Sequence, residues 1–139
     1  MLYLSELEKL NLPEGEYTIV GSGPIAIRNI RVNTDIDILL TKKLWFDLLS
    51  TGKFVRTLDG ELQLSEHIFA YYDWWCAPVT TEEMINSSEY INGFFFVSLE
   101  YFVAFKKKMA RFKDLLNNCF LIPSFSYHFN GRIQKTIEL

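Results

Sequence analysis

Residues 17–40 constrain the fold more than any other part of the chain. Residues 17–20 (Tyr-Thr-Ile-Val) are β-branched and apolar enough to predict a buried strand. Gly21-Ser22-Gly23 predicts a turn, and a short helix over about 24–30 follows, with proline where the first helical turn tolerates it. Residues 35–40 alternate acidic and aliphatic side chains before becoming wholly apolar. This pattern predicts a central strand with one end open to a cleft.

The second strand carries Asp35 and Asp37, two residues apart. Because strand side chains alternate between faces with a period of two, both carboxylates should project from the same side. Carboxylate oxygens are preferred ligands of hard divalent cations, so the pair predicts a metal site. The alternative is that Gly21-Ser22-Gly23 is an ordinary strand-to-helix turn and the two acids only solvate a strand edge. Unpaired carboxylates in a buried aliphatic strand are costly, which favours the metal site.

Caps, turns and periodicity predict the remaining elements. Ser5-Glu6-Leu7-Glu8 has the form of a capping box, which predicts a helix to about Leu10. Asp59-Gly60 predicts a hairpin between a strand over about 53–58 and a strand from Glu61. Further elements are expected as a helix over about 42–50 capped by Thr41, strands over about 68–72 and 93–97, a helix start at 80–83, and a long helix over about 99–120 that Ser98 caps and Pro123 ends.

The length and composition predict one domain. The chain has 139 residues, of which 49% are hydrophobic and 16% aromatic. This is enough apolar material for one packed core and too little length for two ordinary domains. We expect a single α+β domain, with a core over about 15–75, a helical C-terminal part over about 80–122, and a tail over 123–139 that shows no clear periodicity.

Charge and cysteine usage narrow the class of protein. The formal net charge of −3 argues against a protein that grips nucleic acid through an overall basic surface. Cys76 and Cys119 lack metal-ligand spacing, and no secretory leader opens the chain, so a cytoplasmic location is expected. No run reaches the roughly 18 apolar residues that a membrane-spanning helix needs, so no membrane association is expected.

These residues resemble a known family. Ile19-Val20-Gly21-Ser22, a short helix containing Arg28, and Asp35-Ile36-Asp37-Ile38 are similar to the signature of the nucleotidyltransferase superfamily that includes DNA polymerase β, especially its minimal bacterial and archaeal members. The resemblance continues more loosely from Leu99-Glu100-Tyr101 to Lys113-Asp114 and covers roughly half of the chain. It implies a mixed β-sheet flanked by helices, followed by a long C-terminal helix.

The resemblance also implies an activity. In this family the Gly-Ser turn holds nucleotide phosphates and the paired acids bind Mg²⁺ or Mn²⁺. It therefore assigns nucleotide binding to Gly21 and Ser22, and catalysis and metal binding to Asp35 and Asp37. The implied reaction moves NMP from an NTP to a hydroxyl of a protein, an RNA end or a small molecule, with release of pyrophosphate. Arg28 is a candidate phosphate contact, with a surface ion pair as the alternative.

The third acid of active family members has no clear equivalent here. Aligning the tryptophan that follows in small members puts Phe69 or Ala70 at its position. Glu66 and Asp73 are the substitutes within reach, and their opposite parity allows at most one to face the cleft. Glu66 is the candidate catalytic acid, and the alternative is that no third acid exists. The neighbouring His67 could act as a base or ligand, although a lone histidine on a strand is more often structural.

The long helix supplies a candidate cation. On a helical wheel Lys106 falls at the centre of an apolar stripe, with Lys113 about 20° away. The ammonium group of Lys106 could neutralise phosphate in the cleft, or its stem could cross the core edge while the charge reaches water. For Lys113 the second interpretation is favoured. The stripe consists of Leu99, Phe102, Val103, Met109 and Ala110.

Two classes of function therefore remain. The first is a Mg²⁺-dependent nucleotidyltransferase. The second is a catalytically reduced module of the same fold that binds nucleotide or a partner protein, as a regulator or as the antitoxin of a separate toxin-like chain. The many large rings in a small domain also suggest a homodimer or a partner-bound state that would cover them.

Overall fold

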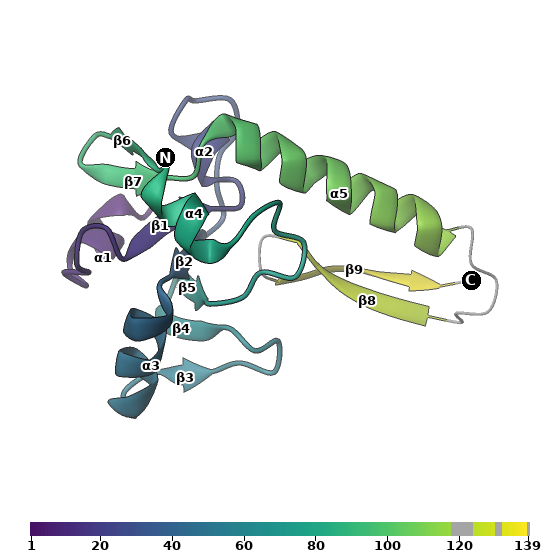
Figure 1. Cartoon of the computed structure of the whole chain (residues 1–139). Coiled ribbons are helices and arrows are strands. Elements are labelled where there is room, and N and C mark those ends of the chain that lie inside the picture. Colours follow the sequence, from purple (N-terminus) through teal and green to yellow (C-terminus); the bar gives the residue numbers. More distant parts are fainter. Residues whose placement is uncertain (118–123, 130–131, 139) are drawn as a thin grey trace.

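The computed structural model describes residues 1–117, 124–129 and 132–138 (Figure 1). They form one α+β domain with a seven-stranded mixed sheet, helices on both of its faces and a separate two-stranded ribbon. The helices are α1 (Leu4–Glu8), α2 (Gly23–Ala26), α3 (Lys42–Ser50), α4 (Thr81–Asn86) and α5 (Leu99–Asn117). The strands are β1 (Tyr17–Val20), β2 (Ile36–Leu40), β3 (Val55–Arg56), β4 (Leu62–Ser65), β5 (Ile68–Tyr71), β6 (Glu89–Ile91), β7 (Phe94–Phe96), β8 (Ser124–Phe129) and β9 (Arg132–Glu138).

The order of the main sheet is β3-β4-β5-β2-β1-β7-β6. The central strand β2 pairs antiparallel with β1 and parallel with β5, and β1 pairs parallel with β7. All five residues of β2 are buried, as a central strand covered on both faces requires. The strand that carries Asp37 therefore lies in the middle of the sheet.

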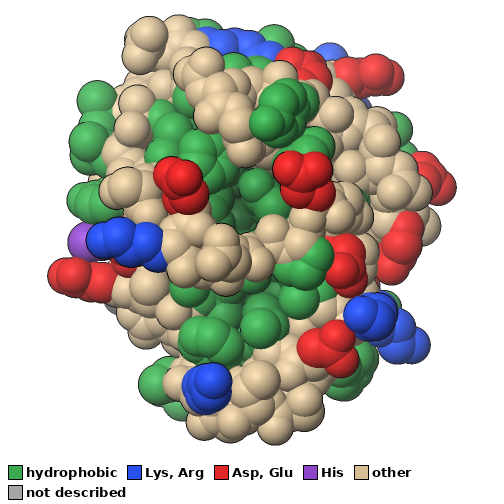
Figure 2. All heavy atoms as spheres, turned by 90° about the vertical axis from the view of Figure 1, so that its left-hand side faces the viewer, with side chains coloured by type: hydrophobic (Ala, Val, Ile, Leu, Met, Phe, Trp, Pro, Cys, Tyr) green, Lys and Arg blue, Asp and Glu red, His purple; other side chains and the backbone are tan. Residues whose placement is uncertain are grey.

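Each face of the sheet has its own hydrophobic cluster. One cluster contains Ile38 of β2 together with Leu7 of α1 and Trp45 of α3. The other contains Leu39 of β2 with Met84 of α4, and Phe105 and Met109 of α5. Helices α1 and α3 therefore cover one face, and α4 and α5 cover the other (Figure 1). On the side of α1 and α3, hydrophobic side chains gather at the centre of the surface with acidic side chains around them (Figure 2).

Several predicted elements are confirmed. Strand β1 and helix α3 have the expected bounds, and Thr41 caps α3 by accepting a hydrogen bond from the Leu44 amide. The prediction that Ser5 caps the first helix is wrong, because α1 begins at Leu4 and no side chain caps it. Helix α2 ends at Ala26, four residues earlier than expected, and β6 was not predicted at all. The predicted end of the long helix near residue 120 lies outside the described residues.

Helix α5 packs through a face that is rotated from the predicted stripe and shares only part of it. Phe105, outside the stripe, and Met109, a member of it, are buried, whereas the stripe residues Leu99 and Val103 are exposed. The ring of Phe105 stacks on Trp74 at a centroid distance of 4.1 Å, so the turn after β5 selects this face of the helix. Lys106 therefore flanks the buried face and does not lie at its centre. Among the helices of the described ranges, none is long and apolar enough to span a membrane.

Candidate functional site

The pairing of β1 with β2 brings the glycine-rich turn and the acids together. Val20, the last residue of β1, lies opposite Asp37. The turn Gly21-Ser22 follows directly, so it lies beside the start of β2, where Asp35 precedes the strand. Segments 13 or more residues apart in the sequence thus meet at one end of the two central strands.

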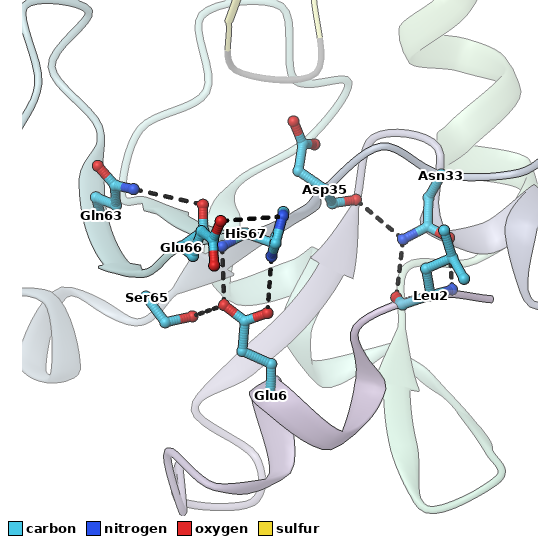
Figure 3. A network of polar contacts seen from close by, with 8 residues as sticks. All are labelled: Leu2, Glu6, Asn33, Asp35, Gln63, Ser65, Glu66 and His67. Atoms are coloured by element: carbon cyan, nitrogen blue, oxygen red, sulfur yellow. Dashed lines mark hydrogen bonds and ion pairs between the residues drawn. The ribbon is translucent and has the colours of Figure 1, made fainter.

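Asp37 is buried and Asp35 is partly exposed. Only 3% of the surface of Asp37 is accessible, and this residue shares the α4/α5 face of the sheet with Leu39 two positions later. The backbone carbonyl of Asp35 accepts a hydrogen bond from Asn33 Nδ2, which also binds the backbone carbonyl of Leu2. The carboxylate of Asp35 points away from Glu6 and Ser65 (Figure 3). Its backbone is thus fixed while its side chain is directed away from this network.

The turn after β1 has the backbone that a phosphate cradle needs. Gly21 has φ +63°, a left-handed conformation that favours glycine. Ser22 makes no capping hydrogen bond to α2 with its hydroxyl. A Cβ atom at Gly23 would overlap Cγ2 of Ile19, so only glycine lets α2 start this close to β1. These contacts fit a phosphate-binding turn, and they also fit an ordinary strand-to-helix turn, because they pack α2 against β1.

A phenylalanine occupies the strand position beside Asp37. In the parallel pairing of β2 with β5, Asp37 lies opposite Phe69. Phe69 belongs to the same hydrophobic cluster as Leu39 and Tyr71, so it faces the same side as Asp37. Within the described parts of the chain, no three carboxylate, histidine or cysteine side chains converge as a metal site. The Asp pair therefore has no third acid from β5.

Glu66 does not join the Asp pair, and the prediction of a catalytic role for it is not supported. It lies in the turn between β4 and β5, where 85% of its side chain is exposed and its carboxylate is 3.9 Å from Nε2 of His67. His67 stacks on Tyr3 at 3.8 Å and contacts Glu6 through Nδ1 at 3.0 Å. As Figure 3 shows, this network ties α1 to the β4–β5 turn. Its role is structural.

The electrostatics of Glu6 fit this structural role. Burial alone would raise the pKa of Glu6. Hydrogen bonds from the Ser65 hydroxyl and from the backbone and ring of His67 outweigh that effect and hold its pKa below the ordinary value.

Arg28 is engaged in an ion pair. Its guanidinium lies 2.5 Å from Oε2 of Glu89 in β6, and it also donates to the backbone carbonyl of Pro24 at 2.7 Å. The alternative of a surface ion pair therefore describes the structure, and Arg28 ties α2 to the edge strand. A role in phosphate binding would require these contacts to break.

Lys106 has a cationic neighbour that the sequence did not indicate. It is half-buried, and its Nζ lies 5.4 Å from the ring centroid of Phe102. Burial, together with the positive charges of Arg31 and Lys113, lowers the pKa of Lys106 to about 8. Arg31 belongs to the loop that leads into Asp35. Arg31 and Lys113 therefore both lie close enough to Lys106 to act on its charge.

The sequence also did not identify Glu61, which is almost fully buried at 2% exposure. The hydroxyl of Tyr71 donates a hydrogen bond to Oε2 of Glu61 and lies 3.5 Å from Oδ1 of Asp37. Tyr71 therefore links this second buried carboxylate to the candidate site. The β4–β5 pairing, which was not predicted, accounts for its burial, because a residue opposite Tyr71 must face the same side of the sheet.

A cavity of about 270 Å³ adjoins Tyr71 at the far end of β5. It is lined by aromatic rings and by charged groups of both signs: Trp45, Arg56, Asp59, Gly60, Tyr71, Tyr72, Asp73, Trp74 and Trp75. Asp73, the other substitute for the third acid, thus lines this cavity.

No family model, curated protein or solved structure matches the chain.

Proposed function

We propose that this protein is a Mg²⁺-dependent nucleotidyltransferase of the minimal type that its sequence resembles. The observation that carries the proposal is the β1–β2 register, in which Asp37 lies opposite Val20 and hence next to Gly21-Ser22. A nucleotidyltransferase needs a phosphate cradle and a carboxylate pair at the same place. The mixed sheet flanked by helices and the long α5 are also what this family implies.

Phosphate binding would use the turn and the neighbouring cations. The left-handed backbone at Gly21 allows a close approach of amide groups to an anion, and Ser22 offers a hydroxyl. The cluster of Arg31, Lys106 and Lys113 would offset the charge of a triphosphate. Arg28 is left out of this site because Glu89 holds it.

The Asp pair suits Mg²⁺ or Mn²⁺. Such hard cations take carboxylate and phosphate oxygens and keep several waters, so two acids and a bound NTP can complete the ligand set. When bound, the ion would polarise the α-phosphate and stabilise the charge that develops during displacement of pyrophosphate. Asp35 and Asp37 would hold it, and the turn would orient the phosphates. The acceptor would be a hydroxyl of a protein, an RNA end or a small molecule.

One observation favours a second candidate function. Phe69 stands beside Asp37 on β5, where a third acid would complete an active centre. A catalytically reduced module that binds nucleotide or a partner protein would tolerate this replacement. A groove between α1 and the β6–β7 hairpin, lined by apolar side chains and by Glu8 and Glu14, offers a surface for a partner with basic residues.

A transfer assay separates the two candidates. The protein is incubated with each of the four NTPs labelled at the α-phosphate, with Mg²⁺ or Mn²⁺, and with the chain itself, RNA or small hydroxyl compounds as acceptors. Label incorporation that requires metal supports the enzyme. Metal-dependent nucleotide binding without incorporation supports the module. No binding of any NTP would contradict the enzyme and the nucleotide-binding form of the module, and would leave only a module that binds a partner protein.

Nucleotide binding should weaken as the pH rises above about 8. The pKa of Lys106 is lowered to about 8, so its positive charge is lost in this range. We expect the affinity for Mg²⁺-NTP to fall by up to about tenfold per pH unit above that value. Lys106→Arg, which stays protonated, should remove this fall. The measurement is a series of nucleotide titrations between about pH 7 and 9.5.

Unfolding would not explain this pH dependence. Because the pKa of Lys106 is lower in the folded state, the unfolded chain binds more protons between about pH 8 and the ordinary lysine range. The contribution of Lys106 to the free energy of unfolding therefore rises with pH in this window. Lys107→Arg, an exposed change on the same helix, is the matched control and should keep the wild-type pH profile. If Lys106→Arg leaves the pH profile of nucleotide affinity unchanged, Lys106 does not take part in nucleotide binding.

A further inference from the structure

Two buried carboxylates lie on one face of the sheet, on either side of β5. Asp37 in β2 is 3% exposed, and Glu61, the residue before β4, is 2% exposed. In the β4–β5 pairing Leu62 lies opposite Ala70, so the next residue outward, Glu61, stands beside Tyr71. Tyr71 and Phe69 share the α4/α5 face with Asp37. The two acids thus face each other across the aromatic side chains of β5.

The hydroxyl of Tyr71 connects them. It donates to Oε2 of Glu61 and lies 3.5 Å from Oδ1 of Asp37, and Tyr71 itself is buried. Its ring is held by Trp74, which in turn stacks on Phe105 of α5. Movement of the Tyr71 ring would therefore disturb Trp74 and its contact with α5. The hydroxyl is therefore a fixed polar contact for Asp37.

Burial of Glu61 is hard to explain by stability alone. A buried carboxylate is costly unless polar groups satisfy it, and an apolar residue of similar volume often folds at least as stably. One hydrogen bond that the Glu61 carboxylate accepts comes from Tyr71, which is also a neighbour of Asp37. Its position therefore indicates a task at Asp37.

We infer that Tyr71, anchored by Glu61, is a positioning residue that orients the Asp37 carboxylate for a divalent cation. This support takes the place of an acid on β5, where Phe69 stands. Ligating carboxylates generally depend on such outer hydrogen-bond partners, and their loss typically weakens metal binding by about 10–100-fold. The inference rests on the proposed function, because it presupposes a metal at Asp35 and Asp37.

The test is the affinity for Mn²⁺ in the presence of a non-hydrolysable NTP analogue, followed by electron paramagnetic resonance of free Mn²⁺. Tyr71→Phe keeps the ring and removes the hydroxyl, and should weaken Mn²⁺ binding by about 10–100-fold. Metal-free binding of the analogue should stay unchanged, which a general structural defect would not allow. Tyr72→Phe is the matched control, because Tyr72 packs toward the α1/α3 face and against Phe46. It should bind Mn²⁺ like the wild type.

Two changes at Glu61 test the anchor. In Glu61→Gln the amide oxygen can still accept the Tyr71 hydroxyl, so Mn²⁺ affinity should stay close to that of the wild type. Glu61→Ala removes the acceptor and should resemble Tyr71→Phe. Thermal unfolding of each variant shows whether it is folded at the assay temperature.

The outcomes separate this inference from the proposed function. Equal Mn²⁺ affinity in wild type and Tyr71→Phe, with metal-dependent nucleotide binding intact, would overturn the positioning role alone. Absence of any metal-dependent nucleotide binding in the wild type would overturn both. A loss of Mn²⁺ affinity in Tyr71→Phe but not in Tyr72→Phe would support both the positioning role and the proposed function.

Discussion

Asp37→Asn should reduce metal-dependent NMP transfer by at least about 100-fold, because a bound metal supplies several kcal/mol of transition-state stabilisation and each 1.36 kcal/mol is a factor of ten. Asparagine keeps the shape of the buried side chain and removes the charge that attracts the cation. Asp35→Asn should have a loss of the same order. Transfer is measured with label at the α-phosphate, and metal-dependent binding of the same NTP by calorimetry.

The matched control for these variants is Asp47→Asn. Asp47 is exposed in α3, where its carboxylate forms an i,i+4 ion pair with Lys43 at 3.5 Å. Such surface pairs contribute little to stability, so this variant should behave as the wild type. Asp37→Asn with full metal-dependent binding and transfer would show that the pair does not hold a metal.

Phe105→Ala should lower the free energy of unfolding by about 3–5 kcal/mol, the usual effect of removing a buried phenylalanine. Phe105 is 3% exposed and stacks on Trp74, so its loss leaves a cavity between α5 and the sheet. Because α5 also carries Lys106, nucleotide affinity should fall as well. Urea denaturation measures the stability.

Val103→Ala is the control for this prediction, since Val103 is 45% exposed on the same helix. A change within about 0.5 kcal/mol is expected. If the predicted stripe faced the core, Val103→Ala would lower the free energy of unfolding more than Phe105→Ala. The comparison therefore tests which face of α5 packs on the sheet.

The central unit of the fold could be predicted from local signals. The β-branched run of β1, the glycine-rich turn and the acid-aliphatic alternation of β2 each point to one local structure, whereas the antiparallel pairing of the two strands was not predicted. Thr41 was predicted to cap a helix and residues 80–83 to start one, and the hydroxyls of Thr41 and Thr80 both accept an amide hydrogen bond at a helix start. One local signal was overlooked: Asn92 and Gly93 both have positive φ, as a type I′ turn requires, and they connect β6 to β7.

The parts that were missed depend on contacts between distant segments. Helix α5 has apolar residues on more than one side, so only its partner, Trp74, decides which side is buried. Glu61 follows a turn and looked like an exposed strand end, and only its pairing beside Tyr71 buries it. Arg28 was a candidate phosphate contact from the family resemblance, but Glu89 of a distant strand holds it in an ion pair.

The central claim is that the Gly21-Ser22 turn and the Asp35/Asp37 pair form one metal and nucleotide site. The most direct measurement is a crystal structure with Mn²⁺ and a non-hydrolysable NTP, in which anomalous scattering locates the metal. We predict a manganese peak within ligand distance of both Asp35 and Asp37, with phosphate oxygens on the amides of the turn. A nucleotide bound elsewhere, or a metal that touches neither aspartate, would contradict the claim.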